Sequence, residues 1–289
     1  YDRTLPEQLI ERAKDADVVL TNKVVLGETE FAQLPRLRYI GVQATGYNVI
    51  DVEAARRHGI TVTNIPAYST DSVAQMVMAL LLNIAQRVDY YAEQNRAGRW
   101  ATSPDFCYWD TPLIELADKQ MGIIGFGRTG SAVAHLAKAF GMKVLAYNRS
   151  RCPEGEAIGQ YVDLETLLAS SDILSLHCPL TQDTIGMINK GTITKMKDGV
   201  ILLNTARGPL LNEQDVTDAL RSGKLRGAAM DVVSQEPMAK NNPLLTAPNC
   251  IITPHMAWTP IEARQRIIDC TVSSIRGFLN GTPVNTVNM

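Results

Sequence analysis

The sequence has almost no excess of charge and no long apolar run. Its 289 residues carry 28 Lys and Arg against 30 Asp and Glu, which gives a formal net charge of −2. Such an even balance argues against a nucleic acid or an anionic membrane as the partner. The longest apolar run, residues 76–85, is interrupted by Asn83 and is typical of a buried helix rather than a membrane span. No internal repeat or low-complexity segment stands out.

The cysteines lack any pairing pattern. There are 5 of them, widely scattered, with no Cys-x-x-Cys motif and no spacing typical of metal ligands. Because a signal peptide is also absent, we expect a reduced, cytoplasmic protein without a bound metal. The sequence begins at Tyr1 in a helix-like segment, and we expect an N-terminal strand to lie outside it. The cysteines are Cys107, Cys152, Cys178, Cys250 and Cys270.

Strand-like and helix-like segments alternate along the chain, which predicts an α/β fold with doubly wound parallel sheets. One helical pattern spans residues 68–100 and begins with the N-cap candidates Ser69, Thr70 and Asp71. As a single helix it would be roughly 40 Å long, enough to bridge two domains. Strands are predicted at residues 16–21, 37–43, 60–65, 171–179, 199–207, 225–233 and 249–255, and further helices at residues 49–59 and 260–281.

The length of the chain predicts two domains, because a single hydrophobic core rarely organises so many residues. We place a Rossmann dinucleotide-binding domain at residues 71–260. The smaller domain is then split between residues 1–70 and 261–289.

A glycine-rich turn lies within residues 120–150, where strand, turn, helix and strand follow one another in a βαβ pattern. In the turn G-F-G-R-T-G, Gly125 permits the sharp bend, Gly127 lets a pyrophosphate approach the backbone, and Gly130 lets the helix pack on the strand. The helix start offers N–H groups to the phosphates. A tight turn without a ligand would also explain the glycines, but the βαβ context favours a dinucleotide site.

The residues after the next strand bear on the choice between NAD and NADP. An acidic residue there binds the ribose hydroxyls of NAD and repels a 2′-phosphate. This sequence has Asn148, Arg149 and Ser150 instead. A neutral amide, a cation and a hydroxyl would accept the phosphate, which favours NADP slightly. In the alternative, Arg149 points into solvent and Asn148 still holds a ribose hydroxyl of NAD.

Three predicted strands end close to side chains suited to acid–base chemistry. Arg207 ends one strand, Glu236 follows the next, and His255 ends the third. Because ligands of an open parallel sheet bind beyond the carboxyl ends of its strands, these groups would meet beside a nicotinamide. In the structural alternative, Arg207 caps a helix or pairs with Glu236. The remaining histidines are interpreted as structural or as lining the site: His58, His135 and His177.

These motifs resemble the D-isomer-specific 2-hydroxyacid dehydrogenase family. The resemblance rests on "GIIGFGRTG", "LHCPLT", "VILLNTARGPLLNEQDVTDALRSGKLRGAAMDVVSQEP" and "TPHMAW" and covers nearly the whole chain. "CYWDTPLIELADKQMGIIGFG" and "PHMAWTPIEARQR" are most similar to its glycerate dehydrogenase (hydroxypyruvate reductase) branch. The resemblance implies a Rossmann domain joined to a smaller, flavodoxin-like substrate domain. Asn148 departs from the family, which usually has an Asp there.

The resemblance also implies roles for the three residues at the strand ends. Arg207 would hold the substrate carboxylate and polarise the ketone. His255 would protonate the carbonyl oxygen as hydride arrives, and Glu236 would orient the ring and favour its protonated form. Thr45 and Gly46 would bind the same carboxylate through backbone N–H groups, and Arg207 and His255 would contact cofactor as well as substrate.

The remaining cofactor contacts implied by the resemblance lie in the glycine-rich turn and in the loops after the strands. Asp231 matches a position that binds the nicotinamide amide. The others, besides the three glycines and residues 148–150, are Arg128, Thr129, His177, Cys178, Pro179, Thr184, Thr205, Ala206 and Ala257.

The function implied is an NAD(P)-dependent interconversion of a small 2-keto acid and its D-2-hydroxy acid, with hydroxypyruvate and glyoxylate as the expected keto acids and D-glycerate and glycolate as the products. A dinucleotide-sensing, corepressor-like binding protein is the alternative from another class. A formate or phosphite dehydrogenase is the nearer alternative, although formate enzymes pair their His with Gln where this chain has Glu236. A homodimer is expected, with residues 86–110 as a contact arm.

Overall fold

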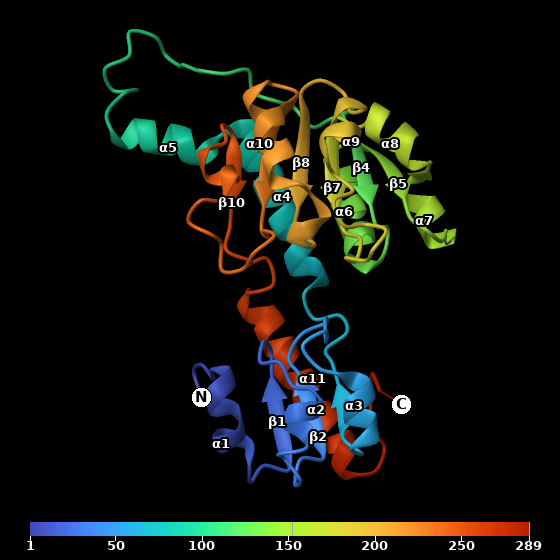
Figure 1. Ribbon diagram of the computed structural model, residues 1–289. Helices are drawn as coiled ribbons and strands as arrows, with labels where there is room; N and C mark the ends of the chain where they lie inside the picture. Colours follow the sequence, from blue (N-terminus) through green and yellow to red (C-terminus); the bar gives the residue numbers. More distant parts are fainter. Residues whose placement is uncertain (152, 289) are drawn as a thin grey trace. The chain divides into compact units, whose positions relative to one another are not determined.

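The computed structural model describes residues 1–151 and 153–288. The chain divides into two compact units, one formed by Tyr1–Ser69 and Thr259–Met289 and the other by Thr70–Trp258 (Figure 1). Over the described residues each unit contains one sheet, and the named strands of both sheets run parallel. The predicted α/β class with parallel sheets is therefore confirmed. Cys152, one of the scattered cysteines, lies outside the described residues.

The discontinuous unit has a three-stranded sheet in the order β1-β2-β3. Its central strand, β2, is entirely buried and packs against α11, where the rings of Tyr39 and Phe278 lie 4.9 Å apart. The chain end returns to the edge strand, because Val287 N–H donates to the Val62 carbonyl at 2.9 Å. The elements are η1 (Pro6–Gln8), α1 (Leu9–Ala13), β1 (Val18–Thr21), α2 (Glu28–Phe31), β2 (Tyr39–Val42), α3 (Val52–Arg57), β3 (Thr61–Thr63) and α11 (Ile261–Leu279).

The unit of residues 70–258 has a seven-stranded sheet in the order β10-β9-β8-β7-β4-β5-β6. The strands run outward from β4 to β6 and then from β7 to β10 on the other side, so the order reverses between β4 and β7. This reversal is the switch point beside which Rossmann sheets bind their ligands. The elements are α4 (Thr70–Gln86), α5 (Val88–Arg96), β4 (Gln120–Ile124), α6 (Arg128–Ala139), β5 (Lys143–Tyr147), α7 (Pro153–Ile158), β6 (Gln160–Tyr161), α8 (Leu164–Ser170), β7 (Ile173–Leu176), α9 (Lys190–Thr194), β8 (Val200–Asn204), η2 (Gly208–Leu210), α10 (Glu213–Arg221), β9 (Leu225–Met230), η3 (Pro243–Thr246) and β10 (Cys250–Ile252).

Helices cover both faces of this sheet, which explains why its inner strands are continuous apolar runs. Along β8, Ile201 and Leu203 belong to the core formed with α4 and α6, whereas Val200 and Leu202 belong to the core formed with α8, α9 and α10. The strands are thus held on both sides, and their following loops emerge at one edge. No helix in the described part of the chain is both long and apolar enough to cross a membrane.

The single long helix predicted at residues 68–100 is wrong. Two helices, α4 and α5, meet at Arg87, whose φ of +50° is left-handed and cannot continue a right-handed helix. The apolar pattern explains the separation. Seven residues of α4 are buried against the sheet and α6, whereas none of the residues of α5 is buried.

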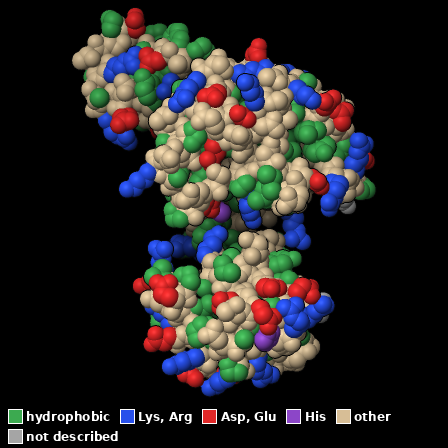
Figure 2. Space-filling model, viewed as in Figure 1, with side chains coloured by type: hydrophobic (Ala, Val, Ile, Leu, Met, Phe, Trp, Pro, Cys, Tyr) green, Lys and Arg blue, Asp and Glu red, His purple; other side chains and the backbone are tan. Residues whose placement is uncertain are grey.

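Residues 87–113 extend away from the body of this unit and include nearly all of the contact arm predicted at residues 86–110 (Figure 1). The segment 87–113 is called the arm from here on. Arg99 and Asp110 close the arm through two N–O contacts of 2.6 Å, and the Tyr90 hydroxyl donates to the same carboxylate at 2.7 Å. The side-chain hydrogen bonds from Arg99 and Tyr90 lower the pKa of Asp110 to about 2. Figure 2 shows hydrophobic side chains mixed with charged ones on the molecular surface. The large exposed apolar side chains of the arm are Val88, Trp100, Phe106, Trp109 and Leu113.

Candidate active site

The glycine-rich turn follows β4 at the switch point. Gly125 has a φ of +92°, and a Cβ at this residue would lie 2.3 Å from the backbone nitrogen of Cys178. A Cβ at Gly130 would lie 2.2 Å from the carbonyl oxygen of Gly125. A Cβ at Gly127, in contrast, would meet nothing within 4 Å. The protein's own packing therefore requires two of the glycines, whereas Gly127 leaves open space above its backbone that suits a pyrophosphate.

Helix α6 begins directly after this open space. It is 12 residues long and starts with Arg128 and Thr129. The N–H groups of its first turn have no partner within the helix and carry the positive end of the helix dipole. The combination of an open glycine and a helix start fits the diphosphate of a dinucleotide.

The loop after β5 contains the residues predicted to select between NAD and NADP. The Asn148 side chain accepts a hydrogen bond from Phe126 N–H at 3.3 Å and donates one to the Ser150 carbonyl at 2.8 Å. It therefore ties the glycine-rich turn to this loop with an uncharged group. Because Asn148, Arg149 and Ser150 include no carboxylate, none of these side chains repels a 2′-phosphate.

The loop after β7 packs against the glycine-rich turn. Nε2 of His177 lies 2.8 Å from the hydroxyl of Ser175, and burial lowers the pKa of His177 to about 4. Its ring is therefore neutral at physiological pH, so we assign it no part in proton transfer. Cys178 is buried, and this burial raises the pKa of its thiol. The Thr184 hydroxyl donates to the Pro179 carbonyl at 2.8 Å and so closes the turn between them.

Arg207 lies three residues beyond the end of β8 at Asn204 rather than at the strand end itself. Its side chain is exposed, and Nη1 donates to the Ala206 carbonyl at 2.7 Å. The described residues show no ion pair between Arg207 and Glu236, so the suggested structural pairing of the two is not seen. The Thr205 hydroxyl, also in this loop, is buried and has no hydrogen-bond partner among the residues described.

The loop after β9 carries Glu236 and packs directly on the loop after β8. A Cβ at Gly208 would lie 1.9 Å from the carbonyl carbon of Val233, so only a glycine permits this approach. Glu213, at the start of α10, accepts a hydrogen bond from Ser234 N–H at 2.7 Å. The Oε1 atom of Glu236 accepts from Val233 N–H at 3.3 Å. These contacts fix the carboxylate of Glu236 beside the loop of Arg207.

His255 lies three residues beyond the end of β10, at a left-handed φ of +53°. This backbone conformation excludes His255 from a strand, and the strand predicted at residues 249–255 ends before it, at Ile252. The ring contacts the loop after β9, since Nδ1 lies 2.7 Å from Oε2 of Glu236. A carboxylate can only accept, so Nδ1 carries a proton and Nε2 is the nitrogen that can exchange one with a substrate.

Asp231 and Ala257 also come together. Asp231 directly follows β9 and is buried, and its Oδ2 accepts a hydrogen bond from Ala257 N–H at 2.9 Å. In the other unit, Thr45 and Gly46 lie in the loop after β2. The Thr45 hydroxyl donates to the Ile65 carbonyl at 2.8 Å, which ties this loop to the end of the neighbouring strand.

Sequence reasoning missed two polar residues that hold these loops, Asn204 and Glu213. Asn204 is the last residue of a buried strand, and Glu213 follows its helix N-cap. An Asn at the end of an otherwise apolar run is a signal that could have been followed, because a buried amide needs hydrogen-bond partners. Glu213 offers no such signal, since an acidic residue is ordinary in the first turn of a helix.

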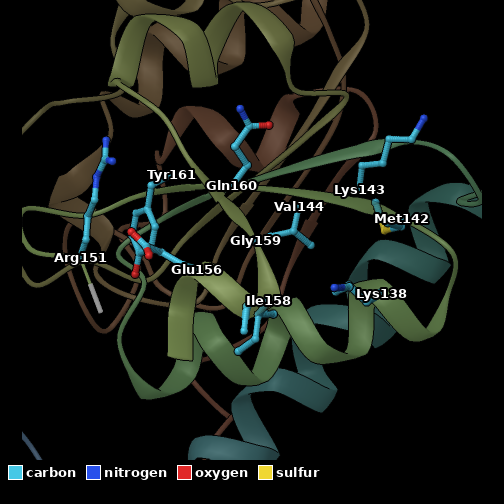
Figure 3. A pocket seen from close by; sticks show the side chains of 11 residues that line it. Lys138, Met142, Lys143, Val144, Arg151, Glu156, Ile158, Gly159, Gln160 and Tyr161 are labelled. Carbon is cyan, nitrogen blue, oxygen red and sulfur yellow. The ribbon is translucent and has the colours of Figure 1, made fainter. Parts of the chain in front are cut away.

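A cavity of about 610 Å³ lies elsewhere in this unit, between α6, α7, β5 and β6 (Figure 3). Lys138 and Lys143 line one side of it and Arg151, Glu156 and Tyr161 the other. None of its lining residues is among the predicted site residues. Over the residues that the structure describes, no group of three or more His, Cys, Asp or Glu is arranged to hold a metal ion.

Comparison with known proteins connects this geometry to a family. Residues 78–257 match the model of the D-isomer specific 2-hydroxyacid dehydrogenase NAD binding domain. The chain is 52% identical to a hydroxypyruvate reductase of Blautia hydrogenotrophica, over 100% of the chain and 91% of that protein. It is 42% identical to a glycerate dehydrogenase of Methylorubrum extorquens, over 99% of the chain and 90% of that protein.

The chain belongs to the D-isomer-specific 2-hydroxyacid dehydrogenase family. The resemblance drawn from the motifs, including the glycerate dehydrogenase branch, is thus confirmed. A solved structure of the same architecture, an acyclic imino acid reductase in complex with NADPH and D-Arg, aligns with a TM-score of 0.85 and 32% identity, over 99% of the chain and 90% of that structure. The chain is therefore a D-2-hydroxyacid dehydrogenase of the class that uses NAD(P).

Proposed function

We propose that this dehydrogenase reduces small 2-keto acids, hydroxypyruvate and glyoxylate, to D-glycerate and glycolate. The observation that carries the proposal is the Glu236–His255 pair, with its 2.7 Å contact, on loops adjacent to that of Arg207. An imidazole held by a carboxylate is a proton donor for a ketone oxygen, and a guanidinium binds a carboxylate. The names of the Blautia and Methylorubrum relatives, hydroxypyruvate reductase and glycerate dehydrogenase, support the first of these two reactions.

In the proposed mechanism the bound nicotinamide supplies the hydride, and the chain supplies orientation and a proton. Arg207 binds the substrate carboxylate with two parallel N–H groups and directs the ketone toward the ring of His255. Nε2 of His255 protonates the carbonyl oxygen and accepts the proton back in the oxidation direction. Glu236 holds Nδ1–H and so fixes the tautomer that the reaction needs. From the family resemblance, backbone N–H groups of Thr45 and Gly46 also bind the carboxylate.

For the cofactor we propose a modest preference for NADP. The loop after β5 offers the Arg149 cation, the Ser150 hydroxyl and the neutral Asn148 amide, and none of these repels a 2′-phosphate. The imino acid reductase of the same architecture, in complex with NADPH, gives the proposal further support. The remaining predicted contacts lie on loops beyond the carboxyl ends of the strands or, for Arg128, Thr129 and Gly130, in the first turn of α6.

We also propose that the enzyme is a cytoplasmic homodimer formed through the arm. The arm folds on itself through the Arg99–Asp110 pair and exposes large apolar side chains, two features of an interface rather than of a loose loop. A Trp109→Asp substitution would place a charge among these side chains. If the arm forms the dimer interface, light scattering should find the mass of two chains for the wild type and the mass of one chain for this variant. The scattered cysteines favour a reducing compartment.

Initial rates test the proposed function. Hydroxypyruvate, glyoxylate and pyruvate would each be assayed with NADH and with NADPH at the nicotinamide absorbance. Rapid oxidation of the cofactor with hydroxypyruvate supports the proposal. The ratio of the rates with NADPH and with NADH tests the role of residues 148–150. Tight cofactor binding without turnover of any keto acid contradicts it and would favour a dinucleotide-sensing protein.

A further inference from the structure

Two buried polar residues end adjacent strands directly beneath the loops of Arg207 and His255. Asn204, the last residue of β8, is 0% exposed. Its Nδ2 donates to the Arg207 carbonyl at 2.9 Å, and its Oδ1 accepts from Ala206 N–H at 3.0 Å. One side chain therefore satisfies both a donor and an acceptor of the short turn that leads to Arg207.

Asp231 does the same for the loop of His255. This residue is 1% exposed, and its carboxylate accepts hydrogen bonds from residues on both sides of His255. Oδ1 accepts from the Thr253 hydroxyl at 2.6 Å and from Met256 N–H at 2.9 Å, and Oδ2 accepts from Ala257 N–H at 2.9 Å. His255 thus sits in the middle of a turn that one carboxylate closes, at a φ of +53° that an unsupported histidine rarely adopts.

The side chains of Asn204 and Asp231, called the two braces from here on, belong to residues that are connected to each other. Asp231 N–H donates to the Asn204 carbonyl at 2.9 Å, and β8 and β9 pair in register at the preceding residue, with Asn204 opposite Met230. A displacement of either residue is therefore transmitted to the other through the sheet. Both braces also lie in a core where apolar side chains would otherwise be favoured, because a buried amide or carboxylate costs free energy unless it is fully hydrogen-bonded.

We propose that Asn204 and Asp231 are positioning residues: Asn204 holds the loop that presents Arg207 to the substrate carboxylate, and Asp231 holds the turn that presents His255 to the ketone. The inference rests on the proposed roles of Arg207 and His255. It assigns the Asp231 carboxylate first to the protein's own loop, with three of its acceptor positions occupied there. Among the residues described, no Lys or Arg forms an ion pair with it, so these hydrogen bonds are what compensate its charge.

Kinetic measurements distinguish the roles of Asn204 and Asp231, because Asn204 is proposed to act on substrate binding and Asp231 on proton transfer. Asn204→Ala frees the loop of Arg207 and should raise KM for the keto acid about tenfold or more, with a smaller change in kcat. Asp231→Asn replaces an acceptor with a donor that faces N–H groups, and should lower kcat about 100-fold through misplacement of His255. Thr253→Val removes one of the three hydrogen bonds with little change of shape and should show the same effect in weaker form.

The matched control is Thr217→Val. Thr217 is equally buried, on α10, and its hydroxyl has no hydrogen-bond partner in the described part of the chain, so its loss should change neither kcat nor KM. A merely structural role for the braces predicts that kcat falls in proportion to the folded fraction while KM stays constant for both variants. That result overturns the proposal, as does unchanged kinetics.

Amide hydrogen exchange in the enzyme without substrate supplies a readout that does not depend on turnover. The amides of Met256 and Ala257 should lose protection in Asp231→Asn and keep it in Asn204→Ala, whereas the Ala206 amide should show the reverse. Protection that persists at Met256 and Ala257, together with a weakened cofactor affinity, would place Asp231 on the cofactor and overturn the proposal. If the wild type reduces no keto acid, the proposed function fails, while the exchange pattern still decides whether the braces exist.

Discussion

The Nδ1 atom of His255 lies 2.7 Å from Oε2 of Glu236, although 19 positions of sequence separate the two residues. They reach each other because β9 and β10 are neighbours in the sheet and each residue lies in the loop that follows its strand. The side chains remain 33% and 36% exposed, so the pair is accessible to a small substrate. The contact fixes which nitrogen of the ring holds a permanent proton and which can exchange one.

Replacement of Glu236 by Gln tests this arrangement. The amide can still contact Nδ1, but it can donate as well as accept, so it no longer fixes which ring nitrogen carries the permanent proton. We expect kcat for keto acid reduction to fall by about 10²-fold, because Nε2 is then no longer held as the nitrogen that exchanges a proton with the substrate. The measurement is the initial rate over a range of keto acid concentrations, which gives kcat and KM separately.

His255→Gln supplies the comparison for that experiment. It removes the exchangeable proton altogether, so kcat should fall by about 10³-fold. Cofactor affinity, measured by fluorescence titration, should stay within about twofold in Glu236→Gln. A Glu236→Gln enzyme with the wild-type kcat would show that the carboxylate does not act through the ring.

Arg207→Ala tests the assignment of the guanidinium to the substrate carboxylate. A charge-assisted, two-point contact contributes about 3 kcal/mol, so kcat/KM should fall about 100-fold, mostly through KM. Arg207→Lys keeps the charge without the planar fork and should recover only part of the loss. Loss of cofactor affinity with an unchanged KM would instead place Arg207 on the cofactor.

The sheet of the nucleotide-binding unit could be predicted from sequence because each strand and turn is marked by a short, continuous stretch of residues. Val200, Ile201, Leu202 and Leu203 form an apolar run typical of a strand covered on both faces, and the glycine turn marks the switch point. The identity of the acid–base residues followed from topology, since neighbouring parallel strands present their following loops at one edge. The family resemblance then supplied the roles.

The details that sequence could not supply depend on single backbone conformations and on tertiary hydrogen bonds. Arg87 and His255 adopt left-handed conformations without the Gly or Asn that usually announces one. Two helices were therefore predicted as one, and the strand predicted to include His255 ends at Ile252. The end of β8 was also predicted three residues too late, at Arg207 instead of Asn204. The position of Asn204 at the end of an apolar run signals a need for hydrogen-bond partners, but the partners themselves are determined by the turn that it closes.

The glycine-rich turn offers a prediction that separates binding from folding. At Gly127 the backbone conformation, with φ −88° and ψ −159°, is open to any residue, and a Cβ would meet nothing within 4 Å. Gly127→Ala should therefore change the free energy of unfolding by no more than about 1 kcal/mol, and should raise the Kd for the dinucleotide about tenfold or more by occupying its space. Isothermal titration and chemical denaturation measure the two quantities.

Gly125→Ala is the counterpart, because the same methyl group there meets the protein itself. It would lie 2.3 Å from a backbone nitrogen and require a φ of +92° from an alanine, so the variant should lose more than about 3 kcal/mol of stability. If Gly127→Ala binds the dinucleotide as tightly as the wild type, the cofactor does not approach the backbone at this residue.

His177 predicts how the stability of the chain depends on pH. Burial lowers its pKa from 6.5 to about 4, so the folded protein holds the ring neutral while the unfolded chain binds a proton as soon as the pH falls below 6.5. Stability from this residue is therefore complete above pH 6.5 and decreases as the pH falls from there toward 4. The difference in pKa corresponds to at most about 3 kcal/mol.

Chemical denaturation between pH 4.5 and 7.5 measures this dependence. His177→Gln keeps a partner for the Ser175 hydroxyl but binds no proton, so its stability curve should be flatter than that of the wild type across this range. An equal slope in wild type and His177→Gln would mean that the ring takes up its proton as readily in the folded protein as in the unfolded chain.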